Sequence, residues 1–361
     1  MHVCRTALAA CLALVPFTIS IPAHAQYQVT NLVSNQVGQA KTIDPLLANA
    51  WGLARSATSP WWISDNDTGW STLYKADGAQ IPLRVVIPTA GNGPTSATGS
   101  NGPGSPTGVV FNGSSDFQIN GAPSDFLFAT LDGTISGWPG TNKNMATIAV
   151  DNSMNKASYT GLAITSKPTG NFLYAADNAN NVVDMYDGNW NLVTTFSDPS
   201  APSSYSVFGV QDINGLVYVS YAVPGVGAGG LIDLFTENGT FVKTLIQGTM
   251  LNQAWGIAAA PGNFGPLSNT LLVSNNSING TINGFDPITG KLVGTIRDEN
   301  GKAIILNNLW GIAFGGGSST NGAANTLFVT VGPGIGANEL AGTFASIRYK
   351  PASATPTVAG K

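Results

Sequence analysis

The sequence predicts an all-β protein, a six-bladed β-propeller built from four-stranded antiparallel blades. Three observations support this fold class: a Gly-aliphatic motif recurs along the chain, three further strand-like runs follow most copies, and no stretch has convincing helical periodicity. The repeated glycines lie about 50 residues apart, within the range of propeller repeats. They are Gly52, Gly108, Gly161, Gly209, Gly256 and Gly311.

The first strand of each unit contains the repeated glycine, and a short apolar run follows it as the second strand. These second runs are rich in β-branched and aromatic residues and are bounded by Gly, Asn and Pro, which indicates strands. We place them at 61–64, 126–129, 172–175, 216–219, 271–274 and 327–330.

The third strand of each unit ends in an aromatic residue and leads toward a turn. Dipeptides such as Asp187-Gly188 and Asn238-Gly239 favour hairpins with positive φ. The third strands are 73–74, 135–138, 183–186, 232–235, 282–285 and 347–349. A fourth strand completes the unit, for example at 192–196, 241–245 and 292–296.

The two ends of the chain predict how the ring closes. The sixth unit stops after its third strand at Tyr349, whereas an apolar strand at 27–33 precedes the first Gly motif. We therefore expect the N-terminal strand to be the fourth strand of the last blade, which leaves no free sheet edge between the first and last blades. The propeller then spans 26–350, with a Gly- and Pro-rich loop at 88–106 and a disordered tail at 351–361.

The first 25 residues have the pattern of an export signal. Arg5 supplies the positive charge, an apolar stretch at 6–21 is too short to span a bilayer, and Ala23-His24-Ala25 is a cleavage site before Gln26. Leu8-Ala9-Ala10-Cys11 also fits a lipoprotein signal, although it lies close to Arg5. We expect the protein to be secreted or periplasmic after cleavage near Ala25, with no transmembrane segment in the mature chain.

Composition restricts the chemistry that the mature chain can perform. The two His and two Cys residues all lie in the first 25 positions, so cleavage after Ala25 removes them. Ser-His-Asp and Cys-His catalysis, disulfides and His-ligated metals are then excluded. The formal net charge of −4 also argues against a nucleic-acid partner. Carboxylate, Lys, Tyr or Ser chemistry remains, as does a hard cation held by oxygen ligands.

Polar and aromatic residues collect where the innermost strands begin and the second strands end, and both positions lie at one face near the axis. We call this the axial face. Our candidate binding residues there are Asn49, Trp51, Asp65, Asn66, Asp132, Asp177, Asn178, Trp255, Asn275 and Trp310.

Three interpretations of the axial-face residues remain open. Asp and Asn cap turns, and the Trp residues pack between blades. Alternatively, Asp65, Asp177 and Asn275 hold a metal ion, since Ca²⁺ takes six to eight oxygen ligands. In the third interpretation the face recognises a polysaccharide or a protein.

Two sets of residues carry resemblances to known families. Asn31-Leu32-Val33-Ser34, the run 44–54 and Trp62-Ile63-Ser64-Asp65-Asn66 resemble an uncharacterised family of exported bacterial propellers, some of which carry PEP-CTERM sorting signals. That resemblance implies export and no established activity. The run 173–183 is similar to an NHL-type repeat and to SMP-30-like and gluconolactonase blades, which implies a central divalent cation held by carboxylate and amide oxygens.

Two functional hypotheses follow from these observations. The first is an exported, monomeric propeller that binds a macromolecule or envelope component without catalysis. The alternative is a Ca²⁺-dependent hydrolase or lactonase.

Overall fold

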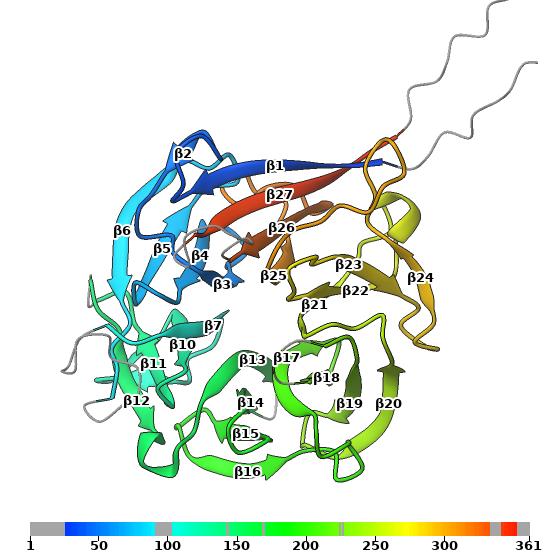
Figure 1. Cartoon of the computed structure of the whole chain (residues 1–361). Coiled ribbons are helices and arrows are strands. Elements are labelled where there is room, and N and C mark those ends of the chain that lie inside the picture. The colour runs from blue at the N-terminus through cyan, green and yellow to red at the C-terminus, as the bar shows by residue number, and fades with distance from the viewer. Residues whose placement is uncertain are drawn as a thin grey trace, which may run out of the picture.

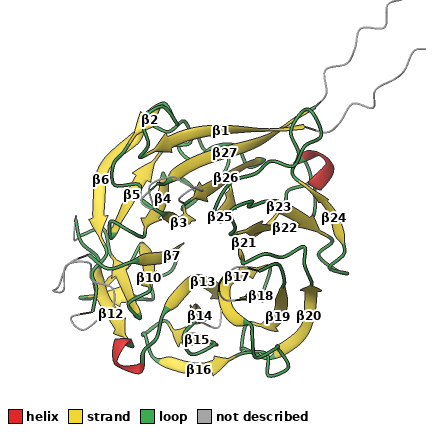
Figure 2. Cartoon of the chain, in the orientation of Figure 1, coloured by secondary structure: helices red, strands yellow, loops and turns green. Residues whose placement is uncertain are grey.

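The structure, a computed structural model, describes residues 26–90, 103–141, 144–167, 170–223, 225, 227–332 and 341–351. In this part of the chain, six sheets surround a central axis and the only helices are two short 3₁₀ turns, η1 (Ser153–Asn155) and η2 (Gly265–Leu267) (Figures 1 and 2). The predicted six-bladed propeller is confirmed. The predicted signal at 1–25, the middle of the 88–106 loop and the tail after Pro351 lie outside the described residues.

Each of the first five blades is a four-stranded antiparallel sheet whose strands run in chain order from the axis outward. Blade 1 contains β3 (Ala50–Ala54), β4 (Trp61–Asp65), β5 (Trp70–Tyr74) and β6 (Gln80–Val86). Blade 2 contains β7 (Pro106–Phe111), β10 (Phe126–Thr130), β11 (Thr134–Trp138) and β12 (Thr147–Asp151). Blade 3 contains β13 (Tyr159–Lys167), β14 (Gly170–Asp177), β15 (Val182–Asp187) and β16 (Leu192–Phe196).

The second half of the ring repeats this order. Blade 4 contains β17 (Ser206–Ile213), β18 (Leu216–Ala222), β19 (Gly230–Thr236) and β20 (Phe241–Gln247). Blade 5 contains β21 (Ala254–Ala259), β22 (Leu271–Asn275), β23 (Ile282–Phe285) and β24 (Leu292–Thr295). The predicted second and third strands all fall within or overlap observed strands.

Blade 6 joins the two ends of the chain. β25 (Leu309–Phe314), β26 (Thr326–Val331) and β27 (Thr343–Lys350) are followed by β1 (Gln26–Ser34), which pairs antiparallel with β27 and places Tyr27 opposite Tyr349. The predicted closure is confirmed (Figure 1). Three short strands were not predicted: β2 (Thr42–Ile43), parallel to β1, and the hairpin β8 (Gln118–Ile119) and β9 (Ala122–Pro123).

The repeated glycine is explained by the close approach of the innermost strands. A Cβ atom on Gly52 would lie 2.5 Å from the carbonyl oxygen of Thr107 in blade 2, and one on Gly256 would lie 2.6 Å from that of Trp310. No side chain fits at such distances. The approach is also closer than 3.0 Å at Gly108, Gly209 and Gly311, whereas a Cβ on Gly161 would lie 3.2 Å from Val210 N. The apolar cores then fill the spaces between blades, as where Tyr174 of blade 3 packs with Phe235 of blade 4.

Hydroxyl groups connect neighbouring blades next to these glycines. Thr107 Oγ1 donates to Tyr159 O at 2.7 Å, Ser220 Oγ to Ala254 O at 2.7 Å, and Ser274 Oγ to Trp310 O at 2.6 Å. Each bond satisfies a buried carbonyl at the edge of an innermost strand and fixes the angle between two blades. In the described residues, no helix is long or apolar enough to cross a membrane.

Candidate functional site

The three predicted tryptophans meet at the axial face. The rings of Trp51 and Trp310 stack with centroids 3.5 Å apart, and Trp255 meets Trp310 edge-on at 5.8 Å. Trp255 Nε1 also donates to Thr160 O, in blade 3, at 2.8 Å. Trp51 and Trp310 are each only 7% exposed. The stacked rings of Trp51 and Trp310 therefore present little open surface to a ligand at the axial face.

Asn49 begins a motif that blades 1, 5 and 6 share. The residue two positions before each Trp has a left-handed backbone, and its carbonyl oxygen accepts a hydrogen bond from a residue that follows the second strand. Asn49 (φ 47°) accepts from Asn66 N, Gln253 (φ 51°) from Asn276 N and Asn308 (φ 50°) from Gly332 N. Asn tolerates this conformation better than most residues, which accounts for Asn49 and Asn308 structurally.

The strand-end side chains form local caps and bridges between blades. Asp177 Oδ1 accepts from Ser158 N at 3.0 Å, and its Oδ2 accepts from Asn180 Nδ2 at 2.7 Å. Asp132 Oδ2 accepts from Ser105 N at 2.9 Å.

Two side-chain amides donate to carbonyl groups of the next blade. Asn66 Nδ2 donates to Pro106 O at 3.1 Å, and Asn178 Nδ2 donates to Val207 O at 2.7 Å. Both carbonyls stand at or next to the beginning of an innermost strand. These hydrogen bonds therefore hold the beginning of the next innermost strand in place, which is a structural role.

The three residues proposed for a metal belong to blades 1, 3 and 5. Asp65 is fully buried, and burial raises the pKa of its carboxyl well above its usual range. Asn275 Oδ1 accepts from Asn252 N at 2.9 Å, and Asp177 holds the turn described above. Within the described ranges, no group of three or more His, Cys, Asp or Glu side chains is placed to hold a metal ion. The Ca²⁺ site stays a prediction.

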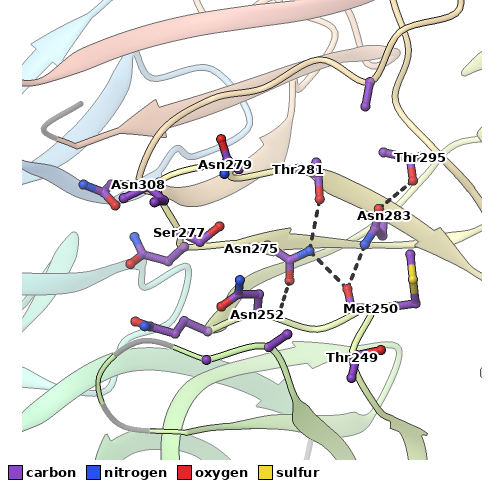
Figure 3. Close-up of a pocket in the computed structure, with 16 residues that line it drawn as sticks. Thr249, Met250, Asn252, Asn275, Ser277, Asn279, Thr281, Asn283, Thr295 and Asn308 are labelled. Carbon is purple, nitrogen blue, oxygen red and sulfur yellow. Dashed lines mark hydrogen bonds between the residues drawn. The ribbon is translucent and has the colours of Figure 1, made fainter. Parts of the chain in front are cut away.

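A cleft of about 630 Å³ opens in blade 5, beside the axis (Figure 3). Seven amide side chains contribute to its lining: Asn252, Gln253, Asn275, Asn276, Asn279, Asn283 and Asn308. Thr249, Ser277, Thr281 and Thr295 add hydroxyl groups, and none of the described lining residues is charged. We call this the amide cleft.

Hydrogen bonds hold part of the amide cleft rigid. Asn283 Nδ2 donates to Met250 O at 2.8 Å, and Thr295 Oγ1 donates to Asn283 Oδ1 at 2.8 Å. Asn275 Nδ2 donates to the same Met250 carbonyl and to Thr281 Oγ1, each at 3.2 Å. Figure 3 shows how these bonds tie the connection that enters blade 5 to the strands beneath it.

The rim of the amide cleft is open to a ligand. Asn279 is exposed there, and so are Ile278, which is 51% exposed, and Met250, which is 44% exposed. A rigid base and an exposed rim are features of a preformed binding site.

Only Asn275 of the amide cleft was among the predicted site residues. The missed residues carry a signal in the sequence, because Asn275, Asn276, Asn279 and Asn283 fall within nine positions. Their convergence depends on the connection before β21, which folds over β23, and strand patterns do not predict that contact.

Fold and site together define a six-bladed β-propeller with an aromatic plug on its axis and a neutral, amide-lined cleft beside it. By sequence, the chain belongs to the family of the uncharacterized protein R648 of Acanthamoeba polyphaga mimivirus, with 30% identity over 306 residues that cover 80% of this chain and 73% of R648. The uncharacterized protein L690 of the same virus is 27% identical over 309 residues, 80% of this chain and 79% of L690. Both relatives are viral, whereas the resemblance drawn from the sequence was to bacterial proteins.

No protein-family profile matches the chain. Among solved structures, a streptogramin B lyase superposes with a TM-score of 0.55 at 10% identity and covers 90% of this chain and 98% of its own. The apo aldose sugar dehydrogenase of Escherichia coli superposes with a TM-score of 0.55 at 11% identity, over 90% of this chain and 100% of its own. At such identities these structures share the propeller fold with this chain and nothing finer.

Proposed function

We propose that this protein is a non-catalytic binding protein that holds a neutral oligosaccharide segment in the amide cleft of blade 5. The observation that carries the proposal is the lining: seven amide side chains and four hydroxyl-bearing residues, with no charge among the described residues, around about 630 Å³. A primary amide both donates and accepts hydrogen bonds, as a sugar hydroxyl does. The volume lies within the range of roughly 300–1,000 Å³ that small-ligand sites occupy.

The lack of charge selects against other ligands. A phosphate, sulfate or carboxylate bound here would lose its hydration without meeting a cation, which is unfavourable. A neutral polyol exchanges hydrogen bonds with water for hydrogen bonds with amides. Asn279 presents its amide at the exposed rim, where a ligand hydroxyl can reach it.

Export fits this function. The signal-like segment at 1–25 and the resemblance to exported bacterial propellers support a protein that meets polysaccharides outside the cell. In this proposal the protein acts as a monomer, because a closed ring needs no partner strand to satisfy its edges.

A glycan array followed by titration calorimetry tests the proposal. We expect binding to neutral oligosaccharides, affinity that changes little with salt, and a loss of about tenfold in Asn279→Ala, equivalent to one or two lost hydrogen bonds. Asn300→Ala is the matched control, because Asn300 is exposed but does not line the cleft. Exclusive binding of peptides or anionic glycans, or full affinity in Asn279→Ala, would overturn the proposal.

A further inference from the structure

One position on the third strand is equivalent in blades 3, 4 and 5. Asp184 pairs with Ala175, Asp233 with Val219 and Asn283 with Val273, so each occupies the same register against the middle of its second strand. All three side chains are buried, with 5%, 0% and 2% exposure. A polar side chain at a buried position needs a hydrogen-bond partner. Here the partner lies in the connection that enters the blade, or is the tyrosine that directly follows this connection.

Blades 3 and 5 supply well-matched partners. In blade 5 the amide of Asn283 donates to Met250 O in the connection 248–253. In blade 3 Asp184 Oδ2 accepts from the hydroxyl of Tyr159 at 2.8 Å, and Asn152 Nδ2 in the connection 152–158 donates to that hydroxyl at 2.7 Å. Both connections are thus held to the third strand by donors that face acceptors.

Blade 4 pairs two carboxyls instead. Asp233 interacts with Asp198 of the connection 197–205 and with Thr244 of β20, yet neither of its oxygens has a well-formed hydrogen bond. Asp198 is only 6% exposed, and its Oδ1 already accepts from Ser200 N and Ser200 Oγ, both at 2.7 Å. The hydroxyl of Tyr221, on β18, accepts from Asp198 N at 2.8 Å. No cation acts on Asp233 among the described residues.

The position of this pair links it to the amide cleft. Asp233 lies on β19, which begins at Gly230, two residues after the cleft-lining residue Ala228. Gly229 N donates to Leu251 O at 2.7 Å, between the cleft residues Met250 and Asn252. Tyr205, at the end of the connection 197–205, packs its hydroxyl against Gly229, where an added Cβ would lie 3.0 Å away.

We infer that Asp198 and Asp233 form a proton-dependent latch that holds one wall of the amide cleft, so that the cleft binds its ligand more tightly when the pair keeps a shared proton. With that proton, Asp233 donates to the Asp198 carboxylate and the connection 197–205 is held against β19. Without it, two buried negative charges face each other and repel. The connection then loosens, and Tyr205 no longer supports the wall at Gly229. The effect on binding rests on the proposed function, whereas the latch itself does not.

The carboxyl of Asp233 gains and loses its proton near neutral pH. Burial is the largest cause that raises the pKa of Asp233, to about 7; Thr244 lowers it, and Asp198 raises it further. A carboxyl raised in this way is protonated at pH 6 and mostly ionised at pH 8. The latch is therefore closed in mildly acidic surroundings and open in mildly alkaline ones.

Hydrogen exchange of the unliganded protein at pH 6 and pH 8 tests the latch, with rates corrected for the intrinsic effect of pH. We expect protection of 197–205 and 227–230 to fall about tenfold at pH 8, in step with the ionisation of a group titrating near 7. Asp233→Asn should keep high protection at both pH values, because an amide can donate to Asp198 without a titrating proton. Asp286→Asn is the control, since Asp286 is in a turn outside this cluster.

Calorimetry with the tightest neutral oligosaccharide from the array then tests the coupling. We expect affinity to be about fivefold to tenfold weaker at pH 8 than at pH 6 in the native protein, and equal in Asp233→Asn. Equal exchange protection at both pH values overturns the latch. Exchange protection that depends on pH, together with an affinity that does not, overturns the coupling of the latch to the amide cleft. Absence of oligosaccharide binding at either pH overturns the proposed function alone, because the exchange measurement stands without a ligand.

Discussion

Blades 4 and 5 are neighbours with the same topology, and they differ at one equivalent buried position. Blade 5 carries Asn283, which is neutral and has partners for both its donor and its acceptor. Blade 4 carries Asp233, whose carboxyl faces a second carboxyl, that of Asp198. Both side chains face the connection that enters the blade, so the difference is chemical rather than architectural.

The comparison concerns blades 3, 4 and 5, where a polar side chain on the third strand faces the incoming connection. In blade 5 this side chain is an amide, which donates to the connection at every pH. In blade 4 the side chain is a carboxyl whose partner is a second carboxyl, so it can donate to that partner only while it is protonated. The same contact therefore becomes sensitive to pH when an amide is replaced by a carboxyl that faces an acceptor.

The largest effect should come from giving blade 5 the chemistry of blade 4. Asn283→Asp replaces the donor to Met250 O by a carboxylate that faces a carbonyl, and we expect a loss of about 3 kcal/mol of unfolding free energy at pH 8. The loss should shrink at pH 5, where a protonated carboxyl can again donate. Urea denaturation at both pH values measures it.

Asn238→Asp is the control for this exchange, since Asn238 lies exposed in the turn between β19 and β20. This substitution adds the same negative charge at an exposed position, and we expect the unfolding free energy to change by less than about 0.5 kcal/mol. If Asn283→Asp were equally mild at pH 8, the anchoring role of this position would be wrong.

The reverse exchange should stabilise blade 4. The folded-state pKa of Asp233 is raised to about 7, so the native protein holds a proton that the unfolded chain releases near pH 4, and stability falls as pH rises between these values. Asp233→Asn removes that loss. Allowing for partial solvent screening, we expect a gain of about 2 kcal/mol at pH 8 and almost none at pH 4. Denaturation curves with the same gain at both pH values would contradict this account.

Sequence reasoning predicted the fold because the signals for it are local and repeated. The glycine of the innermost strand allows the close approach of the next blade, as the 2.5 Å distance at Gly52 shows, and it recurs in all six units. The closure of the ring was predictable for a similar reason, since Tyr349 ends a unit that lacks its fourth strand and the strand before Ser34 supplies it.

The site was less predictable, because its contacts join segments whose separation follows no repeat. The tryptophans stand at equivalent positions of their repeats, but their mutual stacking depends on side-chain directions across the ring. Asp198 and Asp233 lie in different elements, and only the fold of the connection 197–205 brings them into contact. Asn283 occupies a strand position that sequence patterns interpret as ordinary core.

The smallest effect should come from blade 3, where the same position is a carboxyl with suitable donors. Asp184 Oδ2 accepts from the hydroxyls of Tyr159 and Tyr186, at 2.8 and 3.3 Å. Burial still raises the pKa of Asp184, although both tyrosines lower it, so the native protein loses some stability as pH rises through the folded-state pKa of this carboxyl.

In Asp184→Asn the amide oxygen can still accept from Tyr159, and we expect a change of at most about 1 kcal/mol at pH 8, measured by urea denaturation beside Asp233→Asn. The two variants make the same chemical exchange in neighbouring blades. A gain in Asp184→Asn as large as that in Asp233→Asn would mean that burial alone sets the cost of the carboxyl. A clear difference would show that the tyrosine donors of blade 3 are what make a buried charge tolerable there, and that their absence in blade 4 is what leaves Asp233 to titrate.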